Sequence, residues 1–274
     1  MNSRAIRAIV RKDLRMVMRS KAVLAPVVFL PAFLLVALPI AIGFVGWLLE
    51  SKGIALNAKD PGFQQLVERV PEALRGGVDP RRPGLLFVEW VLAHLYAPLF
   101  LLVPIVVANA VAADSFAGDK ERRTLEALLH TPVGNTDLFL AKLLPAWVMS
   151  LTVNLVSFVV YTLVADASAW PVAHRLILPN TLWFVLAFWA GPAVAALALG
   201  ATVLISSRVR GFQEAHQLAS MLVLPLTAPI VGQVIGAMRF SIGAVLLVGL
   251  GLWLLAGLLL WIGMKTFRRD RFLV

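Results

Sequence analysis

The 274-residue chain contains no cysteine, only two tyrosines and four histidines, and charged residues make up just 15% of it. Without cysteine it forms no disulfide bond and no thiolate metal site. It also lacks the Gly-x-x-x-x-Gly-Lys-Ser/Thr phosphate loop, the His-Glu-x-x-His zinc motif and the Gly-x-Ser-x-Gly nucleophile elbow. We therefore expect a protein that is not an enzyme and that holds no metal, nucleotide or other cofactor of its own.

Apolar residues are in excess, at 60% of the chain, and the mean hydropathy is +0.86. This exceeds the apolar share of an ordinary soluble domain, and a core built from 274 residues cannot bury so much apolar sequence. The surrounding medium must therefore be lipid. The net charge of +10 would also suit nucleic acid, but most basic residues flank apolar runs, as in membrane proteins. We expect membrane lipid, and no nucleic acid, as a partner.

Six apolar runs are long enough to cross a bilayer about 30 Å thick, which takes about 20 helical residues. These runs are Val23–Leu49, Val88–Ala113, Leu138–Ala165, Leu178–Ser206, Ala215–Ala237 and Ile242–Met264. Because they are continuous and do not alternate with polar residues, they predict helices and not barrel strands. The expected fold class is an all-α integral membrane protein, with residues 23–274 forming a domain of six transmembrane helices.

The distribution of basic residues predicts the orientation of these spans. When both termini are placed on one side, seventeen of the 25 lysines and arginines fall on that side and eight on the other. Cytoplasmic segments carry the excess of Lys and Arg in membrane proteins. We therefore expect a multi-pass protein of the inner (cytoplasmic) membrane with both termini in the cytoplasm, and an external loop at about residues 50–87.

Residues 1–22 predict an amphipathic helix ahead of the first span. Five arginines recur at intervals of three or four residues and so share one helix face: Arg4, Arg7, Arg11, Arg15 and Arg19. An apolar stripe has similar spacing: Ile6, Val10, Leu14 and Val17. Such a helix lies in the membrane interface, with its basic face toward anionic headgroups. The alternative is a cleaved signal peptide, but the apolar run that follows is far longer than a signal-peptide core.

A charged segment at about residues 114–137 separates the second and third spans. Its centre is the dense cluster Asp119-Lys120-Glu121-Arg122-Arg123. Leu125, Leu128 and Leu129 follow at helical spacing, and Pro132 and Gly134 end the helical pattern. We expect a short amphipathic helix at the membrane surface, with its polar side in water and its leucines available to a partner. The alternative is an ordinary cytosolic loop that its charges keep solvated.

This segment resembles the cytosolic loop of ABC-2 type transporter permeases. The matching residues are Glu121, Thr124, Leu125, Glu126, Leu128, Leu129, Thr131, Pro132 and Lys142. Family members usually show Gly-Thr-Leu-Glu, and Arg123 stands at the position of that glycine. The resemblance implies that the segment contains a coupling helix, which docks on a separate cytosolic ATPase subunit. It also implies that residues 1–22 are the interfacial elbow helix of the family.

On this resemblance, we expect the permease subunit of an ATP-binding cassette exporter, paired with a second permease subunit, identical or related. ATP and Mg²⁺ would be bound by the partner ATPase. The expected ATPase-docking residues are Glu121, Arg122, Arg123, Thr124, Leu125, Glu126, Leu128, Leu129, Thr131 and Pro132. Two other classes stay open, namely an ion-coupled secondary transporter and a non-transporting membrane scaffold.

Polar residues inside spans are candidates for a transport path, because a lipid-facing polar group is costly. The candidates are His94, Asn109, Asn154 and Gln233. Each of them could instead form hydrogen bonds between helices. Glu89, Asp114 and Glu214 lie near predicted span ends, where headgroups or water can solvate them. The lack of a carboxylate deep inside a span argues against a proton-driven carrier.

Overall fold

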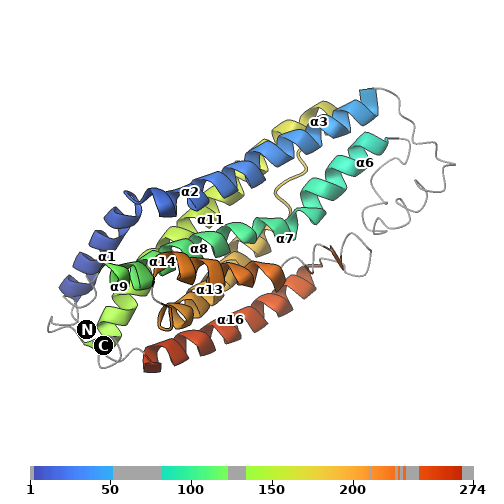
Figure 1. Cartoon of the computed structure of the whole chain (residues 1–274). Helices are drawn as coiled ribbons and strands as arrows, with labels where there is room; N and C mark the ends of the chain where they lie inside the picture. The colour runs from blue at the N-terminus through green and yellow to red at the C-terminus, as the bar shows by residue number, and fades with distance from the viewer. Residues whose placement is uncertain are drawn as a thin grey trace.

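The computed structural model describes residues 3–51, 82–122, 134–209, 211–225, 228, 231–232 and 241–266. Throughout these ranges the regular elements are helices, which form the elongated bundle of Figure 1. Five helices are long and apolar enough to cross a membrane: Val23–Ser51, Ala97–Glu121, Thr136–Ala173, Thr181–Ser206 and Ile242–Lys265. The all-α prediction agrees with this architecture, although five such helices are found among the described residues where six were expected.

The first long helix is preceded by a separate amphipathic helix, as predicted. α1 (Ser3–Val17) ends before Ser20, whose extended backbone sets α1 at an angle to α2 (Lys21–Ala32), as Figure 1 shows. The long helix continues through a π-helical segment, η1 (Phe33–Ala37), into α3 (Leu38–Ser51). Most of the predicted external loop lies in residues 52–81, outside the described part.

The second predicted span is assembled from short helical pieces. They are α6 (Pro83–Trp90), η2 (Val91–Leu95), α7 (Ala97–Phe100), α8 (Leu102–Ala113), η3 (Asp114–Gly118) and α9 (Asp119–Glu121). Pro98 and Pro104 have no N–H to offer the preceding turn, and the α-helical pattern is interrupted at Tyr96 and Leu101, just ahead of each. The helix then continues through η3 and α9 to Glu121, past the predicted end of the span at Ala113.

The remaining elements are α11 (Asn135–Ala173), α12 (Thr181–Val185), η4 (Leu186–Ala190), α13 (Gly191–Ser206), α14 (Phe212–Ser220), η5 (Met221–Val223) and α16 (Ile242–Thr266). α11 is longer at both ends than the predicted third span, Leu138–Ala165. The fourth span begins at Thr181, where the side chain of Asn180 accepts a hydrogen bond from Trp183 N.

The predicted fifth span over 215–237 is not found as one helix among the described residues. α14 is nine residues long, and the described chain continues through the 3₁₀ turn η5 to helical residues at 224–225. The polar or ionisable residues of α14 include Gln213, Glu214, His216 and Gln217, which suit a water-facing end better than lipid. Residues 233–240 lie outside the described part.

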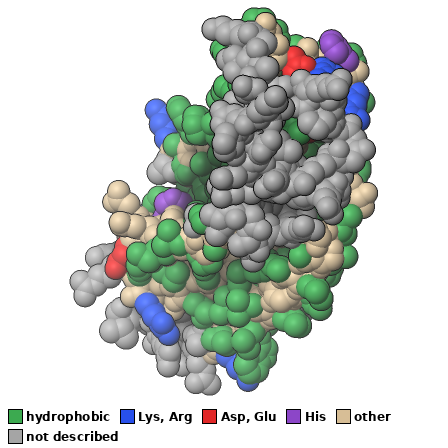
Figure 2. Space-filling view, turned by 90° about the vertical axis from the view of Figure 1, so that its right-hand side faces the viewer, with side chains coloured by type: hydrophobic (Ala, Val, Ile, Leu, Met, Phe, Trp, Pro, Cys, Tyr) green, Lys and Arg blue, Asp and Glu red, His purple; other side chains and the backbone are tan. Residues whose placement is uncertain are grey.

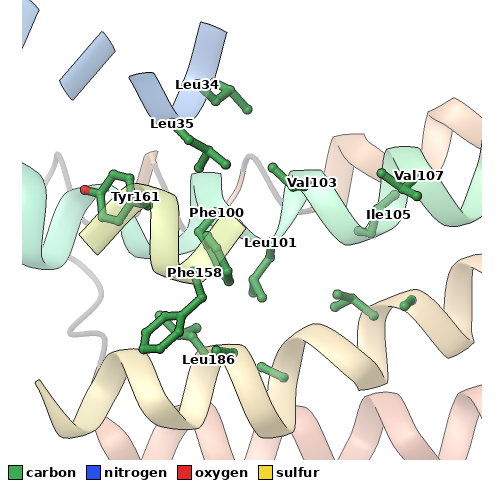
Figure 3. Close-up of a cluster of buried hydrophobic side chains, with 14 of the residues drawn as sticks. Leu34, Leu35, Phe100, Leu101, Val103, Ile105, Val107, Phe158, Tyr161 and Leu186 are labelled. Carbon is green, nitrogen blue, oxygen red and sulfur yellow. The ribbon is translucent and has the colours of Figure 1, made fainter. Parts of the chain in front are cut away.

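The helix Ala97–Glu121 is the centre of the bundle. Its apolar window is 83% buried, compared with 17% for Ile242–Lys265, which packs mainly on α13. Figure 3 shows its side chains meeting those of η1, α11 and η4 around Phe100 and Leu101. Beside them, the ring of Tyr161 stacks between Tyr96 at 4.9 Å and Trp183 at 4.4 Å. Elsewhere, apolar side chains cover much of the described surface, as Figure 2 shows, as expected for helices facing lipid.

The π-helical segments are tied to neighbouring helices through their carbonyl groups. A π turn interrupts the regular i to i−4 ladder and leaves a backbone carbonyl that a side chain can reach. Each of the four described segments has such a bond. The donor–acceptor pairs are Tyr96–Leu34 in η1, Tyr161–Leu92 and Trp183–Ala93 in η2, Lys142–Ser115 in η3 and Asn154–Ala187 in η4. Every one of these donors is buried, so the irregular turns are satisfied inside the bundle.

Candidate functional site

The structure describes only the beginning of the predicted docking segment. Glu121 and Arg122 end the central helix, and both are exposed. The other eight predicted docking residues lie outside the described residues: Arg123, Thr124, Leu125, Glu126, Leu128, Leu129, Thr131 and Pro132. The described chain resumes at Gly134, and α11 begins at Asn135. The site is therefore built from the elements on both sides of residues 123–133.

A buried ion pair fixes the central helix to α11. Lys142 is fully buried two turns into α11, and its ammonium group pairs with the carboxylate of Asp119, which is 1% exposed. The same ammonium donates to the carbonyl oxygen of Ser115 at 2.6 Å and lies 5.7 Å from the ring centre of Phe116. A buried charge is tolerated only when it is paired and hydrogen-bonded, and Lys142 meets both conditions.

The helix α1 joins this pair through two further charges. Lys12 Nζ lies 3.5 Å from Asp119 Oδ2 and 3.2 Å from Asp13 Oδ1. Asp13 is 3% exposed; its burial raises the pKa of its carboxyl group, and Lys142 and Lys12 oppose that rise. Arg122 pairs with Asp114 and donates to Met16 Sδ at 3.0 Å. Three cations and three carboxylates thus balance where α1, α9 and α11 meet; we call Lys12, Asp13, Asp114, Asp119, Arg122 and Lys142 the charge cluster.

The position of the charge cluster corrects two sequence-based expectations. Asp114 was expected near a solvated span end, but it is 3% exposed and enclosed by protein, because the helix continues past Ala113. Asp119 was expected on the polar, water-facing side of an amphipathic helix, but it faces the interior against Lys142. Acidic groups therefore do lie inside a helix of spanning length, each beside a basic partner.

The predicted elbow helix has its basic face outward. Arg11, Arg15 and Arg19 are exposed. Arg4 and Arg7 lie in α1, but their side chains are outside the described part of the structure. Part of the apolar stripe packs on protein, because Val17 is 1% exposed and belongs to the main core. Val17 therefore helps to hold α1 against the bundle.

Two neighbours of Asp119 hold the turn between α13 and α14. Lys120 Nζ donates to the carbonyl oxygen of Val209 at 3.3 Å. Glu121 Oε2 accepts a hydrogen bond from the backbone N–H of Phe212, the first residue of α14, at 3.0 Å. The three residues of α9 thus reach three places: Asp119 contacts α1 and α11, Lys120 contacts the turn, and Glu121 contacts the start of α14.

Two of the predicted transport-path residues, Asn109 and Asn154, form hydrogen bonds between helices. Asn109 is fully buried, donates to the carbonyl oxygen of Ala219 at 3.0 Å and accepts from Thr202 Oγ1 at 2.9 Å. Asn154 donates to Ala187 O at 2.7 Å. His94 is half-buried in η2, and Gln233 lies outside the described residues. Within the described part of the chain, no hydrogen bond joins His94, Asn109 and Asn154 to one another.

Replacing Asn109 with leucine is expected to lower stability by about 1–2 kcal/mol, because two buried interhelical hydrogen bonds of roughly 0.6–1 kcal/mol each are lost. Thermal unfolding in detergent measures this. Thr152→Val is the matched control, since that exposed hydroxyl bonds only to Val148 O of its own helix. An unchanged melting temperature for Asn109→Leu would contradict the structural role.

Sequence reasoning missed the charge cluster, although two signals for it are present. Asp13 is the only acidic residue among the first 49, and it stands in a strongly basic helix. Lys142 interrupts the start of an apolar run. Asp13 is thus an acid among basic residues, and Lys142 is a charge among apolar residues. Each suggests a partner of opposite charge elsewhere in the chain. Among the residues that the structure describes, no group of three or more His, Asp or Glu side chains could hold a metal ion.

Comparison with known proteins gives one family. The family model described as "ABC-2 family transporter protein" matches residues 7–242, which includes most of α1, the charge cluster and the turn before α14. A search of curated proteins gave no match. The match covers well over half of the chain and extends far beyond the short motif on which the sequence resemblance depends.

Proposed function

The chain belongs to the ABC-2 transporter family, and we propose that it is the permease of an exporter driven by a separate cytosolic ATPase. As a member of that family with several membrane-length helices, it is a multi-pass membrane protein and a permease of an ABC transporter. The proposal adds the direction of transport, the site of ATPase docking and the assembly. In it, two permease subunits, identical or related, pair with two ATPase subunits that bind ATP and Mg²⁺.

The observation that carries the proposal is the position of α9. It is the last described element before residues 123–133, and its three side chains contact α1, α11 and the start of α14. A force applied to the following segment would therefore act on several helices at once. This arrangement supports the docking of an ATPase on the leucines of that segment, with closure of the ATPases moving the bundle.

The proposed membrane and topology are the inner membrane with both termini in the cytoplasm. Arg11 and Arg15 are exposed on α1, and Arg19 is exposed just after it; in this topology they would lie against anionic headgroups. Lys265, at the end of α16, lies 3.7 Å from the ring centre of Trp261, a pairing suited to the same headgroup level. This topology places α9 and the docking segment in the compartment that contains ATP.

The test is co-purification of the tagged protein in mild detergent. We expect an ATPase subunit in about equal amount, and we expect Leu125→Asp with Leu128→Asp to remove it, because charges abolish an apolar docking face. Thr136→Asp is the matched control: it adds an acid at an exposed position in the first turn of α11, where a negative charge suits the helix dipole.

Retention of the ATPase by the double variant would contradict the docking site. A well-folded parent that comes out alone from gentle extraction would favour the ion-coupled carrier. Normal membrane insertion of the double variant separates loss of docking from loss of folding.

A further inference from the structure

Lys120 and Glu121 form hydrogen bonds with the backbone at the two ends of the turn that leads into α14. The ammonium of Lys120 donates to a carbonyl, that of Val209, and the carboxylate of Glu121 accepts from an N–H, that of Phe212. Lys120 and Glu121 are adjacent in α9, and each is complementary to the backbone group it bonds: the ammonium to a carbonyl and the carboxylate to an N–H. Val209 is itself buried against Ala113, Ala117 and Ala215, so the turn is packed as well as bonded.

The start of α14 is capped from another helix. Gly211, at the N-cap position, has an extended backbone and no side chain to accept the first free N–H groups of the helix. Glu121 supplies an oxygen to the first of them, with a negative charge that suits the positive end of the helix dipole. A Cβ atom at Gly211 would lie 3.1 Å from Glu121 Oε2, which shows how closely the carboxylate fits against this residue.

Beyond this end, α14 is attached to the bundle by small side chains along one face. Ala215 packs against Ala113 and Ala117, and Asn109 donates to Ala219 O. Side chains on the other faces of α14 are exposed, including Gln213, Gln217 and Leu218. An alanine interface allows close approach with few interlocking side chains, so a displacement at the start of α14 meets little resistance along its length.

We propose that Lys120 and Glu121 are positioning residues that link the ATPase-docking segment to α14, so that movement of the segment moves this helix. The inference rests on the proposed function. Asp119, in the same short helix, ties the segment to α11 through Lys142, so α9 distributes one input to two helices, α11 and α14. The two routes differ in chemistry: the α11 route is a buried ion pair, whereas the α14 route consists of hydrogen bonds from side chains near the surface.

This difference makes the α14 link separable from folding. Lys120 and Glu121 can be truncated without leaving a buried, unpaired charge, and α14 keeps its hydrogen bond from Asn109 of α8 and its packing on Ala113 and Ala117. We therefore expect Lys120→Ala with Glu121→Ala to fold and to lose the movement of α14, which is measured in complexes that retain the ATPase. Glu121 is also one of the expected docking residues, so loss of the ATPase from this variant would overturn the link, because Glu121 would then serve docking. Glu121→Gln is the conservative variant, because an amide oxygen still accepts the N–H of Phe212.

The natural absence of cysteine allows a direct test. An environment-sensitive fluorophore is attached through Gln213→Cys, an exposed position in α14, in the complex with its co-purified ATPase in lipid nanodiscs. Emission is compared without nucleotide and after trapping with ATP, Mg²⁺ and vanadate. We expect a shift on trapping in the parent and in Glu121→Gln, and loss of the shift in the double alanine variant. A second fluorophore site, Thr136→Cys in α11, should keep its response in every variant.

The outcomes separate the inference from the proposed function. A shift at position 213 that survives the double alanine variant overturns the link and leaves the permease function standing. The same conclusion follows when the ATPase co-purifies but the parent shows no shift at position 213. Loss of the response at both fluorophore sites in the double variant also overturns it, because α9 would then act on the bundle as a whole. If no ATPase co-purifies with the parent, the proposed function itself fails.

Discussion

Replacing Lys142 with methionine is expected to destabilise the protein by about 3–5 kcal/mol, because it leaves a buried carboxylate without its closest cation. Asp119 is 1% exposed, and Lys12, at 3.5 Å, is a more distant basic neighbour than Lys142. The carbonyl of Ser115 in η3 would lose its donor as well. Thermal unfolding followed by fluorescence-detected size exclusion should show a fall in melting temperature on the order of 10 °C.

The matched control is Lys265→Met, which removes an exposed cation from the end of α16, where it lies over the ring of Trp261. Its cost should stay within about 1 kcal/mol. Adding Asp119→Asn to Lys142→Met should restore much of the lost stability, since the orphaned charge is then gone. Equal losses for Lys142→Met and Lys265→Met, or no recovery in the double variant, would show that the pair does not stabilise the fold.

The burial of this pair could not be predicted from the sequence, although Lys142 belongs to the motif that resembles the permease family. A run such as Asp119-Lys120-Glu121-Arg122 has the composition of a solvated helix face, and nothing local distinguishes its buried member. The distinction depends on the phase of the helix. The π turn at Asp114–Gly118 adds a residue to one turn and so sets which side chain of α9 faces α11.

The sequence predicted the positions of those apolar helices whose starts depend on hydropathy alone. The first, third, fourth and last spans begin within a few residues of their predicted starts, because a long run of Val, Leu and Ala has no other stable state in lipid. The fifth predicted span, Ala215–Ala237, begins within α14, and only part of it lies among the described residues, so it stays a prediction.

The sequence left the roles of the polar residues in the spans open, and for two of them the structure shows a hydrogen bond to another helix. Asn109 and Asn154 each meet a backbone carbonyl of another helix. Asn154 also lies close against Gly191, where an added Cβ would come within 2.5 Å of its side-chain oxygen. An asparagine in an apolar run has the same appearance whether it binds cargo or a neighbouring helix, so only the fold separates the two roles.

Replacing Gly43 with valine is expected to destabilise the bundle by about 3 kcal/mol, because α3 approaches α11 too closely there for any side chain. A Cβ atom at Gly43 would lie 2.4 Å from the carbonyl oxygen of Ser168 and 2.7 Å from its carbon. These are backbone atoms of a long helix and cannot rotate away, so α3 would have to withdraw along its length. The measurement is the melting temperature together with the monodisperse yield in detergent.

Gly251→Val is the matched control, because a Cβ atom there meets no described atom within 4 Å. Both changes add the same side chain to the interior of an apolar helix, so insertion into the membrane and helix propensity are affected alike. Only the close helix contact differs. Gly251→Val should therefore keep the parent's melting temperature while Gly43→Val loses several degrees. If the two variants melt alike, α3 and α11 do not pack as closely in the membrane as the contact between Gly43 and Ser168 requires.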